Sequence, residues 1–388
     1  MSELNSIPRL PVFGWSAFSG ERQAFEPSLL DTPNLNFTTS GRAAIALALE
    51  RLGIVAGDAV LVPTYHCPTM VSPIVALGAT PVFFPIGESG GPDVDALPSL
   101  DLARVRAIIA VHYFGIPQPL AKLRKWCDDN NVLLIEDCAH ALFGASDRRN
   151  VGQWGDAAIG SLTKFLPVPE GGCVLFNRDV GGPILLRRRG VLSQLRAALD
   201  ILEMGARHGR MPGLNGILRT VFAAKRRLRA GSRSQPPDAR LEPREGLAFD
   251  RSGAAGDRLA LACRWIARRM PLERVATRRR ENYARLVAAL SETRGLHPLF
   301  PELPPSSVPY VVPLWVDDPD PVYRAMRARG LPVFRWDWLW PGVPLLPRDH
   351  GMTWSKHILQ LGCHQDLDPE NISQIVRVVR EVVGQAKI

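Results

Sequence analysis

The amino-acid sequence predicts an α/β fold, in which a large domain with a mostly parallel central sheet covered by helices is followed by a smaller C-terminal α+β domain. Two observations lead to this prediction. Short apolar runs alternate with segments of helical periodicity between residues 40 and 137, a pattern typical of a parallel sheet covered on both faces. The 388 residues are 46% hydrophobic and 22% charged, which is typical of soluble globular proteins and argues against disorder.

The first helix is predicted over residues 40–53, because apolar residues recur there at helical spacing and Gly53 follows as a stop signal. In such a sheet ligands bind at the carboxyl ends of the strands, so polar residues that follow a strand are candidates for a site. The candidates here are Thr64, Tyr65, His66 and Asp137. Strands are predicted at 59–63, 81–86, 105–115 and 132–137, with helices at 68–77 and 118–129.

Residues 183–245 interrupt this alternation. Two helices with basic faces are predicted there, followed by a loop over 231–246. The second helix carries an apolar stripe at helical spacing, which consists of Leu214, Ile217, Leu218, Val221 and Phe222.

A long helical region is predicted over residues 257–291, with Pro271 as a break. The smaller domain follows over residues 292–388. Its predicted elements are strands at 310–316 and 331–336 and helices at 319–329 and from 369. The large domain is accordingly predicted over residues 1–256, and 257–291 is predicted to connect the two domains.

The net charge of +9 resides in one segment. Residues 183–245 contain 13 Arg and one Lys against two Asp and three Glu, whereas the rest of the chain has 33 basic and 33 acidic residues. Because the basicity is local, it does not indicate that the chain binds nucleic acid. The basic, apolar helices are expected either to contact an anionic membrane surface or to pack on the protein itself or on a second copy.

Several classes of protein are excluded by simple features. No run of about 18 apolar residues is present, which argues against a spanning helix, and the first residues lack the pattern of a secretory signal. The six cysteines form no CxxC pair, so we expect reduced thiols in a cytoplasmic protein and neither a disulfide framework nor a metal site.

Three features suggest a specific chemistry, although each has an ordinary alternative. Lys164 stands alone in an uncharged stretch, where a desolvated amine can form a Schiff base, but most single lysines are solvated. Asp137 ends an apolar strand and can pair with a pyridinium nitrogen, or it can simply cap the next helix. Ser40, Gly41 and Arg42 open a helix, whose N-terminus suits a phosphate, although Ser40 can be a plain cap.

Seven segments together resemble the DegT/DnrJ/EryC1/StrS family of sugar aminotransferases, which are pyridoxal phosphate (PLP) enzymes of fold type I. Their order and spacing are more specific than any one of them. The segments read SGRAAIALALERLGIVAGDAVLVP, VALGATPVFF, VRAIIAVHYFG, VLLIEDCAHALFGA, VGQWGDAAIGSLTK, PEGGCVLFN and HQDLDPENISQIVRVV. The resemblance implies the PLP-dependent transferase fold.

The resemblance also implies roles for individual residues. Lys164 corresponds to the lysine that binds PLP as a Schiff base and then acts as the general base. Asp137 corresponds to the partner of the pyridinium nitrogen, and His140 to a residue that contacts the ring hydroxyl side. The phosphate would be bound by Gly41, Arg42, Ala43 and Ser161, although the stretch that carries Ser161 is shorter than in the family pattern.

Two departures from the family pattern are evident. The family commonly places an aromatic residue over the cofactor ring where this chain has Cys67, so His66, or else Tyr65, is expected to cover that face. A GxNxRM-like segment that reaches a neighbouring subunit in the family is missing, and Arg251 and Ser252 are its candidate replacements.

The resemblance therefore implies a PLP-dependent aminotransferase that moves an amino group from an amino acid, with glutamate as the expected donor, to a keto sugar, with a nucleotide-linked sugar expected. A homodimer is implied in the same way. The alternative is a non-catalytic family member that acts as a binding module, associated with a membrane surface through residues 183–245. The intact Lys164 and Asp137 argue against that alternative.

Overall fold

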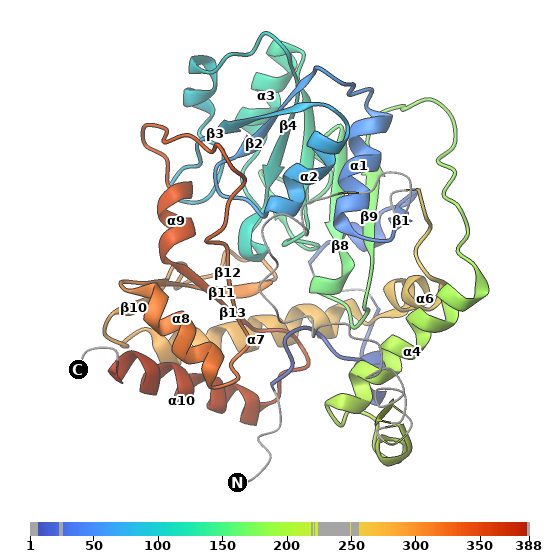
Figure 1. Ribbon diagram of the computed structural model, residues 1–388, viewed down its shortest axis with the longest axis vertical. Coiled ribbons are helices and arrows are strands. Elements are labelled where there is room, and N and C mark those ends of the chain that lie inside the picture. Colours follow the sequence, from blue (N-terminus) through green and yellow to red (C-terminus); the bar gives the residue numbers. More distant parts are fainter. Residues whose placement is uncertain are drawn as a thin grey trace.

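The computed structural model describes residues 7–22, 26–218, 220, 222–223, 249 and 256–385. Two sheets organise these residues (Figure 1). The larger sheet has seven strands in the order β1-β9-β8-β5-β4-β2-β3, and the smaller has four in the order β10-β11-β13-β12. A short hairpin of β6 (Ala145–Ser146) and β7 (Arg149–Asn150) is separate from both.

The large sheet is mostly parallel, as the sequence predicts. Strands β2, β3, β4, β5 and β8 run parallel to one another, whereas β9 pairs antiparallel with both β8 and β1. Its strands are β1 (Asn36–Thr38), β2 (Ala59–Pro63), β3 (Thr80–Phe84), β4 (Val105–Val111), β5 (Leu133–Asp137), β8 (Ala157–Ser161) and β9 (Gly172–Phe176). The helices that pack against this sheet are α1 (Gly41–Arg51), α2 (Pro68–Ala76) and α3 (Ala121–Asn130).

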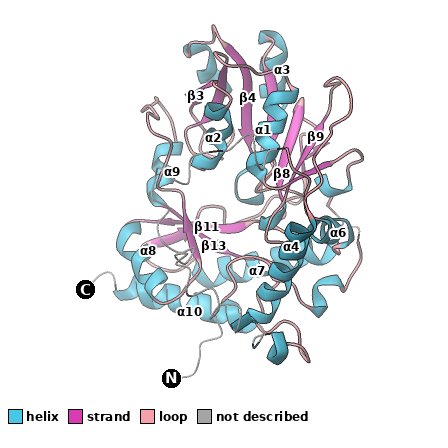
Figure 2. Ribbon diagram, turned by 45° about the vertical axis from the view of Figure 1, so that its right-hand side comes forward, coloured by secondary structure: helices cyan, strands magenta, loops and turns pink. Residues whose placement is uncertain are grey.

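The small sheet is antiparallel throughout and packs against helices on one side (Figure 2). Its strands are β10 (Leu296–Pro298), β11 (Val311–Val316), β12 (Val333–Arg335) and β13 (Ile358–Gly362). The surrounding helices are α7 (Leu272–Leu290), α8 (Pro319–Ala328), α9 (Gly351–His357) and α10 (Pro369–Gln385). Apolar residues of α7, α8 and α10 join the sheet in a second core, which includes Leu286, Val322 and Val379.

Residue Pro271 separates two helices of the connecting region. It is the N-cap of α7 and follows α6 (Leu261–Arg269), because a proline inside a continuous helix would remove a backbone hydrogen bond. The α/β fold class is thus confirmed. The boundary near residue 256 stays a prediction, since residues 250–255 lie outside the described part of the chain.

The basic segment is described only in part. Its first predicted helix is α4 (Val191–Arg207), and the second falls largely outside the described residues, as does the loop predicted over 231–246. Phe222 of the predicted stripe is 3% exposed, and Leu218 packs against it. Leu214 and Ile217 are 40% and 64% exposed, whereas Val221 is outside the described residues. The inner half of the stripe therefore packs on the protein itself.

Among the described residues, no helix combines the length and the hydrophobicity needed to cross a bilayer. All six cysteines are free thiols, and Cys67 is the one among them that is not buried.

Candidate active site

A cavity of about 240 Å³ lies between the two sheets, at the carboxyl edge of the large one. The large sheet and its helices contribute one wall, and the small sheet contributes the other. The residues from the first wall include Ser40, Gly41, Arg42, Cys67, Asp137, His140, Ser161 and Lys164. Those from the second wall are Tyr310, Phe334, Trp336 and Gln360. The structure therefore brings together six of the eight residues that the sequence nominates.

Lys164 reaches the cavity from a short 3₁₀ helix, η5 (Leu162–Lys164), that follows β8. The buried Leu162 and Phe165 fix the chain on both sides of it. Its Nζ lies 5.4 Å from the centre of the Tyr310 ring. Burial lowers the pKa of Lys164 below the ordinary 10.5, while the charges of Asp137 and Cys67 oppose this effect. A lysine with a lowered pKa is a better nucleophile near neutral pH.

Asp137 ends β5, between β4 and β8, and is 4% exposed. Its Oδ1 accepts a hydrogen bond of 2.8 Å from the Ala139 N–H, so the carboxylate also stabilises the turn that follows the strand. Burial raises the pKa of Asp137 above the ordinary 3.8, and the positive charge of Lys164 acts against this rise. A buried carboxylate of this kind is stabilised by a cationic group in the cavity.

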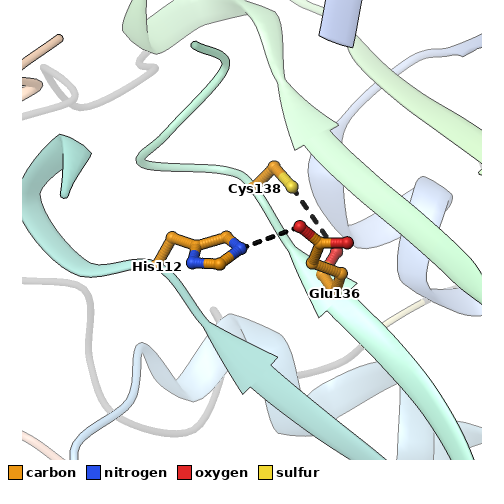
Figure 3. Close-up of side chains that lie close together, drawn as sticks. All are labelled: His112, Glu136 and Cys138. Atoms are coloured by element: carbon orange, nitrogen blue, oxygen red, sulfur yellow. Dashed lines mark hydrogen bonds and ion pairs between the residues drawn. The ribbon is translucent and has the colours of Figure 1, made fainter. Parts of the chain in front are cut away.

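Glu136, which precedes Asp137 in β5, stabilises the end of this strand through hydrogen bonds to its side chain (Figure 3). His112 Nε2 donates to Glu136 Oε1 at 2.9 Å, and backbone N–H groups of Gly152 and Trp154 donate to the two carboxylate oxygens at 2.6 and 2.9 Å. The Gln118 N–H donates to His112 Nδ1 at 2.8 Å, which fixes the tautomer of the ring. Burial alone would raise the pKa of Glu136, but these hydrogen bonds outweigh it and hold the pKa low.

Glu136 and His112, together with Cys138, form a group of side chains of the types that bind metal ions. Ligand-type atoms of His112, Glu136 and Cys138 lie within 4.8 Å of one another, the one such group among the described residues. However, both Glu136 oxygens and both His112 nitrogens already have hydrogen-bond partners. The cluster is therefore a support for the strand that positions Asp137.

The first turn of α1 faces the cavity. Ser40 is its N-cap, and its Oγ accepts a hydrogen bond of 3.2 Å from the Ala43 N–H. Ala43 is not among the residues that line the cavity, and its N–H donates to the cap, so its role at a phosphate site stays a prediction. A Cβ at Gly172 would lie 2.2 Å from the Ser40 carbonyl oxygen, so only glycine lets β9 approach this turn.

His140 lies in the cavity wall with no protein partner for either ring nitrogen. It is 2% exposed, and its ring is 4.6 Å from Tyr310 and 4.8 Å from Trp336. Burial, followed by the charge of Lys164, holds its pKa well below 6.5. The neutral ring therefore offers one donor and one acceptor to whatever occupies the cavity.

His66 lies outside the cavity, so the structure corrects its assignment as the residue that covers the ring. Its Nδ1 donates to the Pro63 carbonyl at 2.9 Å, and its Nε2 accepts from the Trp340 N–H at 3.0 Å. The imidazole stacks on Phe83, with the ring centres 5.3 Å apart. Tyr65, the other candidate, is fully buried and is not among the residues that line the cavity either. Both side chains are held by the junction between the two sheets.

Cys67 itself lines the cavity, with its Sγ 3.0 Å from Thr69 Oγ1. The aromatic side chains in the wall come instead from the small sheet, as Tyr310, Phe334 and Trp336. Sequence reasoning missed these three residues and Gln360. A signal was present, because Tyr310 and Trp336 stand at the ends of predicted strands, but nothing in the sequence indicated which end meets the large sheet.

The proposed replacements for the missing family segment, Arg251 and Ser252, lie outside the described residues. Ser161 lines the cavity at the end of β8, with its Oγ 3.4 Å from Thr163 Oγ1. Gly41 packs beside it, since a Cβ at Gly41 would be 3.6 Å from the Ser161 Cβ. The two residues therefore form one corner of the cavity.

A wider hollow of about 600 Å³ lies elsewhere, beside the starts of β4 and β5. Several of its charged side chains are paired, since Arg124 and Arg178 donate to Asp156 at 2.9 and 3.3 Å. It contains neither Lys164 nor Asp137. The candidate chemistry therefore belongs to the smaller cavity.

Comparison with known proteins shows what the chain is similar to. Residues 21–190 match the model of the DegT/DnrJ/EryC1/StrS aminotransferase family. GDP-perosamine synthase from Vibrio cholerae is 33% identical over 203 residues, which are 50% of this chain and 55% of that protein. A dTDP-3-amino-3,4,6-trideoxy-alpha-D-glucose transaminase from Micromonospora megalomicea subsp. nigra is 34% identical over 154 residues, 39% of this chain and 41% of that protein.

The likeness in structure extends further along the chain. The aminotransferase TlmJ from Streptoalloteichus hindustanus superposes with a TM-score of 0.63 at 22% identity, covering 91% of this chain and 87% of that one. The sequence matches to curated relatives, by contrast, span about half the length of those proteins or less. Residues 21–190, which contain Lys164, Asp137 and His140, are therefore similar to the DegT/DnrJ/EryC1/StrS aminotransferase family, and the chain shares its fold with an aminotransferase of known structure.

Proposed function

We propose that the chain is a PLP-dependent aminotransferase that transfers an amino group from an amino acid to a nucleotide-linked keto sugar. One observation carries the proposal: a lysine with a lowered pKa and a buried carboxylate face the same enclosed cavity. This pair is what a Schiff-base cofactor with a ring nitrogen requires.

The residues present fit PLP. The two unpartnered nitrogens of the buried His140 need a polar ligand, because burying them unpaired costs free energy. Asp137 would hold the ring nitrogen, and Lys164 would bind the aldehyde. Gly41 and Arg42 at the start of α1, with Ser161, would hold the phosphate, where the helix dipole favours negative charge.

When bound, PLP supplies an electron sink for the bond to be broken at the amino-acid α-carbon. The chain's own residues supply the rest. Lys164, once displaced by the amine of the donor, would take the proton from the α-carbon as general base. Asp137 would keep the proton on the ring nitrogen, and the aromatic wall of Tyr310 and Trp336 would exclude water from the reacting atoms.

The substrate class is supported by the relatives. GDP-perosamine synthase and the dTDP-amino-sugar transaminase are named for sugars that carry a nucleotide. Glutamate is the amino donor that the family resemblance implies, and we propose it on that ground. The cavity also offers aromatic rings, against which the C–H faces of a sugar pack well.

The test begins with the purified chain and PLP. Reduction with borohydride should leave the cofactor on Lys164, located by peptide mass spectrometry. Glutamate, glutamine and aspartate are then compared as donors by the loss of the cofactor's absorption, and a panel of GDP-, UDP- and dTDP-keto sugars is compared as acceptors. Absence of an adduct on Lys164 would favour the non-catalytic binding module.

We also expect a homodimer. Apolar side chains of α4 and α6 are exposed, and they are Leu192, Leu195, Leu199, Leu261 and Trp265. The two helices are in contact, since the Gln194 side chain accepts from the Leu261 N–H at 2.8 Å. A second copy covering this face would remove these side chains from water. Sedimentation of the wild type against Leu195→Asp with Trp265→Ser tests this, and an active monomer would contradict it.

Contact of residues 183–245 with anionic membranes remains the competing expectation for the same segment. Each Lys or Arg near such a surface contributes about 1 kcal/mol, within a Debye length of about 8 Å. Co-sedimentation with anionic and neutral vesicles at low and high salt is the measurement. A chain that stays in solution with anionic vesicles at low salt would exclude this contact.

A further inference from the structure

Arg279 of α7 is a fully buried arginine with an unusual set of partners. Its Nη2 donates to the Lys164 carbonyl at 2.7 Å, and its Nη1 donates to the carbonyls of Pro309 and Tyr310 at 3.0 and 3.2 Å. Its Nε donates to Gln365 Oε1 at 2.9 Å. None of these four acceptors carries a charge.

Such an arrangement is energetically costly. Burial of a guanidinium without a carboxylate partner loses hydration that neutral carbonyls only partly replace. This burial lowers the pKa of Arg279 to about 10. The face of the Phe165 ring, 4.4 Å from the guanidinium carbon, provides a further attraction. A leucine or methionine at this position of α7 could be buried without the loss of hydration that a guanidinium suffers. Packing alone therefore does not account for the arginine.

The hydrogen-bond partners of Arg279 indicate why a buried guanidinium is present at this position. Lys164 ends η5 on the large sheet, whereas Tyr310 precedes β11 of the small sheet. One rigid, planar group therefore binds the main chain of both residues. Gln365 strengthens the link, because its Nε2 donates to the Phe165 carbonyl at 2.7 Å, next to Lys164. The side chains of the same two residues meet in the cavity, where the Lys164 Nζ lies over the Tyr310 ring.

We infer that Arg279 is a positioning residue for Lys164: it fixes the lysine main chain against that of Tyr310 and so holds the amine in the desolvated part of the cavity. The inference rests on the proposed function in taking Lys164 as the reacting amine. Arg279 is not among the residues that line the cavity. It acts through the two carbonyls that it binds.

The experiment measures the amine itself, without PLP. The full chain, freed of cofactor, is acetylated with acetic anhydride between pH 6 and pH 11, and peptide mass spectrometry follows Lys164. The variants are Arg279→Lys and Arg279→Ala. The matched control is Arg278→Ala, because Arg278 is the preceding residue of α7, is one-third exposed and pairs with Glu281 on the same helix.

We expect Lys164 of the wild type and of Arg278→Ala to titrate below the ordinary lysine value. Both Arg279 variants should titrate higher, and their Lys164 should react about three to ten times more slowly at pH 8, because the released amine gains water. Arg279→Lys keeps the charge but cannot span both carbonyls. A purely electrostatic role would therefore leave that variant at the wild-type profile.

Added guanidinium at low concentration should restore the profile of Arg279→Ala, and methylammonium should not, because only the former reproduces the planar fork. If both variants melt like the control and retain the wild-type profile, the inference is wrong. If Arg279→Ala does not fold, a wild-type profile for Arg279→Lys alone overturns it. The failure of the proposed function has a separate signature, which is the absence of a reduced PLP adduct on Lys164 in the wild type.

Discussion

The Lys164 amine lies over the face of the Tyr310 ring, 5.4 Å from its centre, although the two residues belong to opposite walls of the cavity. A ring face attracts a cation, and the enclosing walls penalise the same charge. Burial lowers the pKa of Lys164 below its ordinary value, although the negative charge of Asp137 opposes this effect. The reactivity of this amine therefore depends on the closure of the two sheets over it.

Replacement of Lys164 by alanine should abolish the covalent bond to PLP and the transfer of the amino group. The fold should persist, with a loss of about 1 kcal/mol or less in unfolding free energy, because no hydrogen bond of the Nζ is broken. Reduction with borohydride and peptide mass spectrometry measure the first effect, and urea unfolding measures the second. Lys125→Ala, on the exposed face of α3, is the control. Turnover by Lys164→Ala at the wild-type rate would contradict the assignment.

Replacement of Asp137 by asparagine should slow the amino-acid half-reaction by about 10² to 10⁴. The amide cannot hold a proton on the ring nitrogen, but its oxygen can still accept from the Ala139 N–H, so the turn after β5 is retained. Single-turnover absorption changes with glutamate measure the rate. An unchanged rate, with PLP bound, would leave Asp137 with its structural role at that turn alone.

Replacement of His140 by glutamine should be tolerated, because the amide offers a donor and an acceptor as the neutral ring does. His140→Leu should weaken PLP binding about ten- to a hundredfold, since a polar group of the ligand would lose its partner at a cost of about 1–3 kcal/mol. Equilibrium dialysis of PLP measures both variants. Equal affinities for glutamine and leucine would show that His140 makes no hydrogen bond to the cofactor.

Stability should fall as the pH drops from 6.5 towards 4. Burial lowers the pKa of His66 and of His364 to about 4, so the unfolded chain takes up these protons first. Protonation of His66 Nε2 would also turn the acceptor of the Trp340 N–H into a second donor. Each histidine contributes about 3 kcal/mol over this range.

His66→Gln should remove about half of the pH dependence that these two histidines produce, because glutamine does not titrate. Denaturant unfolding, followed by tryptophan fluorescence at several pH values, measures it. The matched variant is His364→Gln, which should have a similar effect. An unfolding free energy of the wild type that is constant between pH 6.5 and 4 would contradict the prediction.

The sequence predicted the large-sheet half of the cavity well. Strand β2 was placed at residues 59–63 and β5 ended at Asp137, because apolar runs and stop signals are local. Residues that follow such strands converge at one edge whatever the rest of the chain does. Asp137 could therefore be nominated without the structure, whereas Lys164 was indicated by its uncharged surroundings and by the family resemblance.

The sequence could not predict the other wall, because contacts between the sheets are not local. His66 was assigned to the ring, but the Trp340 N–H and Phe83 hold it at the junction. Trp336 lines the cavity since the loop after β12 folds towards the large sheet, and no periodic pattern indicates that direction. The sequence also did not indicate that the Ala43 N–H donates to the cap of α1.

The cavity wall from the small sheet comes from residues that are synthesised after Lys164 and Asp137. Tyr310, Trp336 and Gln360 must all be synthesised before the cavity can close. A chain that has been synthesised only as far as Lys164 contains the two reactive groups, but it lacks the enclosing wall and the Arg279 guanidinium that binds the Lys164 carbonyl. We therefore expect a chain truncated before Gln360 to lack a closed cavity, because part of the wall from the small sheet is missing.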